Sequence, residues 1–207
     1  MTKPPGVILA GGLARRMGGG DKGLLRLDDK TILDHVIARL APQTDGLAIN
    51  ANGDESRFAS LGLPVIADSV DEFPGPLAGV LAGLDWAAER GADCIVTAAA
   101  DTPFLPDDLV DRLRAAAMGN ALPFALAATP DPERGQNRHP TFGLWPVALR
   151  DDLRAALADG VRKVVAWTDG HGAAIALFDT GKGDPFFNVN TPEDLETARR
   201  ILAEAAV

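Results

Sequence analysis

Cysteine is almost absent from this sequence, since Cys94 is the single one among 207 residues. A disulfide within the chain is therefore impossible. Cys94 begins the apolar run 94–96, which predicts that its side chain serves as a small buried hydrophobe. A chain without disulfides is typical of a reducing compartment, and we expect the protein to be cytoplasmic.

Long apolar runs are missing as well. No stretch approaches the ~18 residues that a membrane-spanning helix requires. The first residues, from Met1 to Gly6, contain no long apolar core of the kind that a signal peptide has. We therefore expect a soluble, unprocessed protein that makes no contact with a membrane.

Positive charge is scarce overall, with 20 Lys and Arg against 29 Asp and Glu and a formal net charge of −9. This balance argues against broad binding to nucleic acid, because massed basic side chains supply most of the affinity for a phosphate backbone. Arg15, Arg16 and Lys22 nevertheless lie close together in a glycine-rich stretch that follows the first apolar segment. Such a local cationic loop can hold one small polyphosphate, since ligands respond to the local field.

Short apolar segments alternate with amphipathic ones along the whole chain. The apolar segments predict strands at 6–10, 47–51, 64–67, 93–100, 124–129, 141–145 and 173–178. The amphipathic segments predict helices at 31–40, 78–89, 106–118, 148–158, 161–167 and 191–205. The polar segment 130–139 predicts a surface loop or a hairpin. This alternation predicts one α/β domain over 1–207, with a three-layer, mostly parallel, Rossmann-like sheet covered by helices on both faces.

The glycine-rich loop after the first strand is the first candidate site, because ligands of open parallel sheets bind beyond the carboxyl ends of the strands. A Walker loop is excluded, since Lys22 follows Asp21 and precedes Gly23 instead of Ser or Thr. Gly18, Gly20 and Gly23 match the dinucleotide pattern G-x-G-x-x-G by letter but lie well past the strand, so we interpret this match as chance. A surface loop without a ligand is the remaining alternative.

Three polar residues follow other predicted strands. Asp101 precedes Thr102-Pro103 at the end of one strand, where its carboxylate either binds Mg²⁺ together with phosphate oxygens or caps the turn. Asn50 and Asp68 follow two further strands in the same way. A carboxylate or carbonyl there can accept the N–H donors of guanine, although Asn and Asp are also common turn residues.

The residues 9–18, followed by Asp21-Lys22, resemble the signature loop L-A-G-G-x-x-x-R-M-G-x-x-K of sugar-phosphate and cofactor nucleotidyltransferases. Their Gly-Gly form with Asp-Lys is similar to the molybdenum cofactor guanylyltransferases, whereas cytidylyltransferase relatives more often carry Ala-Gly. The resemblance extends from about Gly6 through the last predicted helix. It implies a fold like that of the nucleotide-diphospho-sugar transferases, with Mg²⁺ as the cofactor.

The resemblance also implies roles for individual residues. The implied catalytic residues, which disperse charge on the phosphates or hold the metal, are Arg16, Lys22 and Asp101. The implied nucleotide-binding residues are Leu9, Ala10, Gly11, Lys22, Asn50, Asp68 and Asp101, of which Asp101 also binds the metal. Two clusters are candidates for binding the second substrate, a bulky anionic pterin: Arg138 with His139, and Asn188 with Asn190. An ordinary loop histidine and a helix cap are the alternatives for His139 and Asn190.

The implied reaction is attack by the terminal phosphate of molybdopterin on the α-phosphorus of GTP, with release of pyrophosphate. The nucleophile is already anionic, so no covalent enzyme intermediate is needed. Proteins of molybdenum insertion and molybdoenzyme maturation are the implied partners. Two rival functions remain open: transfer of a different nucleotide by a cytidylyl- or sugar-phosphate transferase, and a noncatalytic module that binds GTP or pterin.

Overall fold

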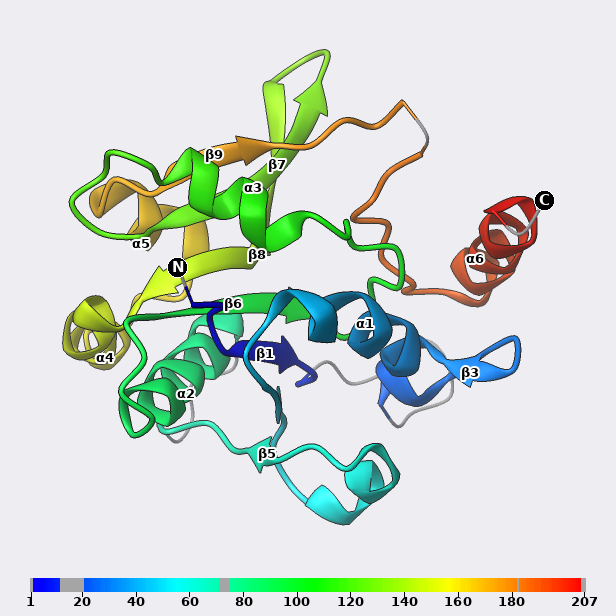
Figure 1. Ribbon diagram of the computed structural model, residues 1–207, viewed down its shortest axis with the longest axis horizontal. Coiled ribbons are helices and arrows are strands. Elements are labelled where there is room, and N and C mark those ends of the chain that lie inside the picture. Colours follow the sequence, from blue (N-terminus) through cyan, green and yellow to red (C-terminus); the bar gives the residue numbers. More distant parts are fainter. Residues whose placement is uncertain (1, 12–20, 71–74, 182, 206–207) are drawn as a thin grey trace.

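The structure is a computed structural model that describes residues 2–11, 21–70, 75–181 and 183–205. Its centre is a seven-stranded sheet with the strand order β5-β4-β1-β6-β8-β7-β9 (Figure 1). The strands are β1 (Gly6–Leu9), β4 (Leu47–Asn50), β5 (Val65–Ile66), β6 (Cys94–Ala99), β7 (Ala125–Asp131), β8 (Gly135–Pro146) and β9 (Ala174–Leu177). β5, β4, β1 and β6 pair in parallel, as do β7 and β9, whereas β8 runs antiparallel to both of its neighbours. The predicted, mostly parallel sheet is therefore confirmed.

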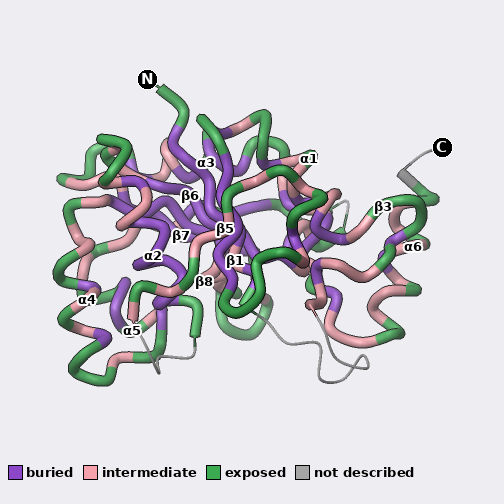
Figure 2. The backbone as a smooth tube through the Cα atoms, turned by 90° about the horizontal axis from the view of Figure 1, so that it is seen from below, coloured by how far each residue is buried: buried purple, intermediate pink, exposed green. Residues whose placement is uncertain are grey.

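Helices cover both faces of this sheet. They are α1 (Ile32–Leu40), α2 (Pro76–Ala88), α3 (Leu109–Ala116), α4 (Arg150–Ala158) and α5 (Val164–Gly170), and a further helix, α6 (Pro192–Ala205), follows at the end of the chain. Side chains of a strand point alternately to its two faces, so β1 contributes Ile8 to the core beneath α1 and α3, and Val7 to the core beneath α2, α4 and α5. The buried residues gather between the layers (Figure 2). The three-layer arrangement expected from the sequence is thus present.

The last helix, α6, packs outside these layers. A small hairpin of β2 (Arg26–Leu27) and β3 (Lys30–Thr31) turns at Asp28, whose φ is 57°. A separate buried cluster contains Leu27 of this hairpin, Val189 from the segment before α6, and Ala198 of α6 itself. The C-terminal segment is therefore held against the region that follows β1.

The helices predicted at 31–40 and 191–205 begin within one residue of the expected positions, at Ile32 and Pro192. The N–H of Asp34 donates to Thr31 Oγ1 at the start of α1, and the backbone N–H of Thr31 donates back to the Asp34 carboxylate. Thr191 and Asp194 exchange the same pair of hydrogen bonds at the start of α6. Each pair satisfies N–H groups that the first helical turn leaves without partners.

Several boundaries differ from the expectation. The helix predicted from Pro106 begins only at Leu109, because residues 106–108 form turns. The 3-10 helix η4 (Glu55–Leu61) was not predicted. Of the two forms expected for the segment 130–139, a surface loop or a hairpin, the structure has the hairpin, since β7 and β8 stay paired out to Asp131 and Gly135. None of the described helices is both long and apolar enough to cross a membrane.

Candidate active site

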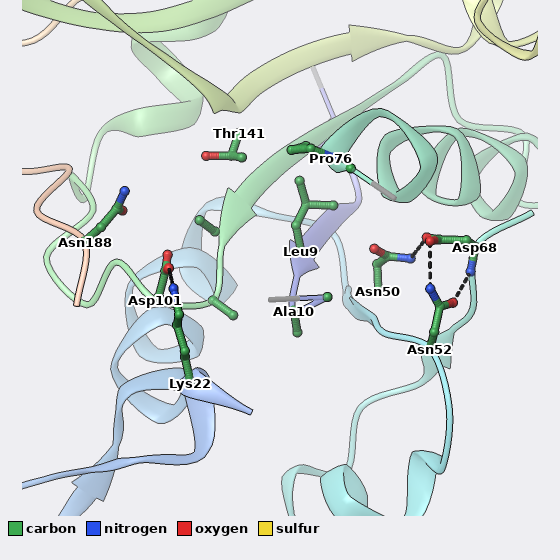
Figure 3. Close-up of a pocket in the computed structure, with 15 residues that line it drawn as sticks. Leu9, Ala10, Lys22, Asn50, Asn52, Asp68, Pro76, Asp101, Thr141 and Asn188 are labelled. Carbon is green, nitrogen blue, oxygen red and sulfur yellow. Dashed lines mark hydrogen bonds and ion pairs between the residues drawn. The ribbon is translucent and has the colours of Figure 1, made fainter. Parts of the chain in front are cut away.

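A cavity of about 470 Å³ opens at the carboxyl ends of β1, β4 and β6 (Figure 3). These three strands are parallel, so the residues that follow them meet at one edge of the sheet. The cavity is lined by eight of the residues named from the sequence, which are Leu9, Ala10, Gly11, Lys22, Asn50, Asp68, Asp101 and Asn188. Asn52 and Thr141 also line it and were not singled out from the sequence. The structure therefore gathers most of the sequence-predicted positions into one place.

One wall of the cavity places a cation beside a carboxylate. Lys22 begins the short 3-10 helix η2 (Lys22–Leu24), and its Nζ lies 3.6 Å from Asp101 Oδ2 at the end of β6. Both side chains are mostly buried, with 21% of each exposed. Burial raises the pKa of Asp101 above its usual value, and the nearby ammonium of Lys22 opposes this shift. This wall therefore carries charges of both signs.

Gly23 explains how Lys22 can approach Asp101. A β-carbon at Gly23 would lie 3.3 Å from both the Cβ and the carbonyl oxygen of Ala100, the residue before Asp101. The backbone of η2 thus rests directly on the end of β6. A larger residue at this position would push η2, and Lys22 with it, away from the carboxylate.

The segment before α6 closes the same wall. Lys22 Nζ donates to Asn190 Oδ1 at 2.5 Å, and Thr102 Oγ1 donates to Asn188 Oδ1 at 2.5 Å. The N–H of Val189 also donates to the carbonyl oxygen of Asp101 at 2.9 Å. The two amides expected to face a second substrate therefore lie beside the lysine and the aspartate, although the sequence separation between Thr102 and Asn188 is 86.

The opposite wall is built from two amides and a carboxylate. Asn50 Nδ2 donates to Asp68 Oδ1 at 2.9 Å, and Asn52 Nδ2 donates to Asp68 Oδ2 at 2.8 Å. Asn52 Oδ1 in turn accepts the N–H of Asp68 at 2.9 Å, so this amide holds Asp68 by two hydrogen bonds. Figure 3 shows these side chains across the cavity from Lys22 and Asp101. Asn52 could have been found from the sequence, because it lies two residues beyond Asn50, just after the end of the same strand.

Helix α2 supports this wall. A β-carbon on Gly79 would lie only 2.2 Å from Asn50 Oδ1 and 2.9 Å from Leu9 Cδ2, so the helix passes directly behind the asparagine. Gly75 and Pro76, at the first turn of the same helix, line the cavity. The positive end of the α2 macrodipole is thus at the cavity, where it favours an anion.

Comparison with known proteins then decides the family. Residues 6–173 match the family model described as the MobA-like NTP transferase domain. A protein of Bradyrhizobium sp. (strain ORS 278) named molybdenum cofactor guanylyltransferase is 52% identical over 205 residues, which is 98% of this chain and 94% of that protein. A protein with the same name from Rhodopseudomonas palustris (strain BisB5) is 54% identical over 200 residues, covering 95% of this chain and 93% of that protein. The chain belongs to the molybdenum cofactor guanylyltransferase family.

Solved structures support the fold that this guanylyltransferase family shares. The molybdopterin-guanine dinucleotide biosynthesis protein A of Archaeoglobus fulgidus superposes with a TM-score of 0.70 at 23% identity, covering 97% of this chain and 99% of that one. The 4-diphosphocytidyl-2C-methyl-D-erythritol synthase of Anaerococcus prevotii superposes with a TM-score of 0.74 at 14% identity, covering 98% and 99%. The expected likeness to nucleotidyltransferase folds is therefore confirmed.

Four of the residues predicted for the guanylyltransferase site are not among the described residues that line the cavity. One is Asn190, which accepts the hydrogen bond from Lys22 but does not itself line the cavity. Arg16 lies outside the described residues. Arg138 pairs with Asp169 of α5 at 2.5 Å and does not line the cavity. His139 does not line it either, because it stacks on Phe186 with 4.3 Å between ring centroids. Roles for Arg138 and His139 in binding a second substrate stay predictions.

Proposed function

We propose that this chain transfers GMP from GTP to molybdopterin, forming molybdopterin guanine dinucleotide and releasing pyrophosphate, within a single nucleotidyltransferase domain spanning 1–207. The observation that carries the proposal is one cavity with the Lys22–Asp101 pair on one wall and the Asn50–Asp68 pair on the other. Two relatives that share about half of their residues with this chain are named molybdenum cofactor guanylyltransferase, which supports the same reaction.

The two walls suit the two ends of a nucleoside triphosphate. Lys22 would bind the phosphates, because an ammonium group favours anionic oxygens, and Leu9, Ala10 and Gly11, which line the cavity, would contact the nucleotide. Asn50 and Asp68 would face the nucleoside. Guanine carries adjacent N–H donors on its pairing edge, and the Asp68 carboxylate retains lone pairs that can accept them.

Mg²⁺ is the cofactor that this donor set fits. Asp101 presents a carboxylate at the cavity beside the amide oxygens of Asn188 and Asn190. No cluster of three or more His, Cys, Asp or Glu side chains exists in the described part of the chain. Mg²⁺ needs only one or two carboxylates when phosphate and water oxygens complete its shell. When bound, it would offset the charge that develops on the phosphate oxygens.

The protein's own contribution is alignment and charge neutralisation. The attacking group is a phosphate that is already anionic, so neither a general base nor a protein nucleophile is required. Lys22 would neutralise the phosphates of the nucleotide, and Arg16 would add a second cation. Asn188 and Asn190, with Arg138 and His139, are the proposed contacts of the acceptor. Cytoplasmic location and partnership with molybdenum-insertion and molybdoenzyme-maturation proteins belong to this proposal as well.

Release of pyrophosphate from Mg–GTP and molybdopterin by the purified protein tests the proposal. We expect Asp101→Ala to lower turnover by about 100-fold or more, the cost of removing one group that stabilises transition-state charge. Lys22→Ala should weaken the use of GTP. Lys163→Ala removes an exposed lysine that does not line the cavity, so it should leave the rate unchanged.

The rival functions predict other outcomes. Binding of GTP without any release of pyrophosphate would favour the noncatalytic module. Faster turnover with CTP than with GTP would favour a cytidylyltransferase. Near-normal rates in folded Lys22→Ala and Asp101→Ala variants would reject the assignment of the site.

A further inference from the structure

A chain of polar contacts runs beside the cavity and joins its two walls. It consists of Asp21, Arg57, Asn52 and Asp68, and we call it the strap. Arg57 Nε lies 2.7 Å from Asp21 Oδ2, and Arg57 Nη2 donates to the carbonyl oxygen of Asn52 at 2.7 Å. Asn52 then holds Asp68 by the two hydrogen bonds described above. Asp21 immediately precedes Lys22, so the strap begins at one wall and ends at the other.

Arg57 is the central member of the strap and is held in place from several sides. It lies on η4, which Asp54 caps by accepting the N–H of Ser56. Its guanidinium carbon lies 4.9 Å from the ring centroid of Phe58, which is buried in the main core. The Nε atom has no hydrogen-bond partner among the described residues, so its contact with Asp21 is an ion pair.

Burial makes that ion pair stronger than an ordinary surface pair. The Asp21 side chain is 12% exposed and the Arg57 side chain is 32% exposed. A partly desolvated pair is less screened by water and salt than one on the open surface. Loss of the Arg57 charge would leave the Asp21 carboxylate mostly buried without this cation.

We infer that Arg57 is a positioning residue that couples the two walls of the proposed GTP site. These are the wall of Lys22 and Asp101, assigned to the phosphates, and the wall of Asn50 and Asp68, assigned to the nucleoside. Neither Arg57 nor Asp21 lines the cavity, so both act through their neighbours Lys22 and Asn52. Fixing both walls before the ligand arrives lowers the ordering cost of binding. A ligand that spans both walls, such as GTP, gains from this preorganisation. The inference rests on the proposed function, because it assumes that the cavity binds GTP.

A double-mutant cycle on the full chain tests the coupling, with the Kd of Mg–GTP measured by calorimetry. We expect Arg57→Gln and Asp21→Asn each to raise this Kd by about 5- to 20-fold. The double variant should resemble Arg57→Gln, since that change already breaks the contact with Asp21 as well as the one with the Asn52 carbonyl. Arg57→Lys should give an intermediate Kd, because a lysine ammonium cannot reach Asp21 and the Asn52 carbonyl with the same geometry. Turnover assays should show a raised KM for GTP and an unchanged KM for molybdopterin.

Arg39→Gln is the matched control. Arg39 pairs with Asp107 at 3.0 Å on the surface, and neither residue lines the cavity. The control therefore loses one arginine and one ion pair without touching the strap, and its Kd for GTP should equal that of the wild type. Asp21→Asn keeps the test available even if a change at Arg57 disturbs folding.

Two results would overturn the inference. One is a Kd within twofold of the wild type for folded Arg57→Gln or Asp21→Asn. The other is a double variant whose effect equals the product of the single effects, because independent residues would then be involved. A wild-type protein that fails to bind GTP at all would instead overturn the proposed function, and the coupling with it.

Discussion

Replacement of Gly79 by alanine tests whether the wall of Asn50 and Asp68 binds the nucleotide, because the loss of GTP affinity can be compared with the loss of stability. The new β-carbon would lie 2.2 Å from Asn50 Oδ1, far inside the ~3.5 Å at which non-bonded heavy atoms attract one another. Asn50 is 5% exposed and has little room to move aside. Its displacement would break the hydrogen bonds of Nδ2 with Asp68 Oδ1 and with the carbonyl oxygen of Ile66.

The expected magnitude follows from opposing effects. Alanine is preferred over glycine inside a helix by about 1 kcal/mol. Overpacking costs about 1–3 kcal/mol, and each lost hydrogen bond costs about 1 kcal/mol. The free energy of unfolding should therefore fall by about 2–4 kcal/mol. The Kd of GTP should rise by about tenfold or more, because Asn50 leaves its position and Asp68 loses the hydrogen bond from Asn50.

Gly83→Ala, one turn further along α2, is the control for this variant. Its β-carbon would lie 2.8 Å from Ile95 Cδ1 and 2.9 Å from Val7 Cγ2, in the core and not at the cavity. Urea denaturation should show that both variants are destabilised, whereas calorimetry should show weaker GTP binding for Gly79→Ala alone. Equal GTP affinity in the two variants would refute the assignment of the Asn50–Asp68 wall to the nucleotide.

Three other variants test separate parts of the account. Asp101→Asn replaces a carboxylate whose ionised form is disfavoured by burial. The variant should therefore abolish Mg²⁺-dependent turnover, and in the absence of metal its Tm should be no lower than that of the wild type. A marked drop in Tm would contradict this. Thr31→Ala removes the capping box of α1 and should cost about 1 kcal/mol in urea denaturation, with the Kd of GTP unchanged. Burial lowers the pKa of His139 below its usual 6.5, so the unfolded chain takes up the proton first and stability should fall as the pH drops from 6.5. His139→Gln should flatten this pH dependence of the unfolding free energy, and an unchanged slope would exclude His139 as its source.

The fold was predictable where the signal is local. Buried parallel strands such as β1 and β6 are short apolar runs between turn residues, and both appear where the sequence predicts them. The antiparallel pairing of β8 with β6 was not predicted, because the pairing partner of a strand depends on contacts distant in sequence. The start of α3 was misplaced by three residues because Pro106 and Asp107 form a turn before the helix proper.

The site, like the fold, was predictable from local patterns but not from contacts between distant parts of the chain. Lys22, Asp101, Asn50 and Asp68 each follow a strand or belong to a loop with a recognisable pattern, and the structure places all four around the cavity. The approach of Asn190 to Lys22 joins positions separated by 168 in the sequence, which no local pattern encodes. The stacking of the His139 ring on Phe186 likewise joins distant parts of the chain, and the sequence alone did not indicate it.

Thermal denaturation in the presence of nucleoside triphosphates tests the central claim most directly, because a ligand that binds only the native state must raise the Tm. With Mg²⁺ present, we predict that GTP raises the Tm of the wild type, that CTP and UTP do so weakly, and that the GTP effect is reduced in Lys22→Ala. A Tm that GTP leaves unchanged, or that CTP raises equally, would contradict the claim that this cavity is a GTP site.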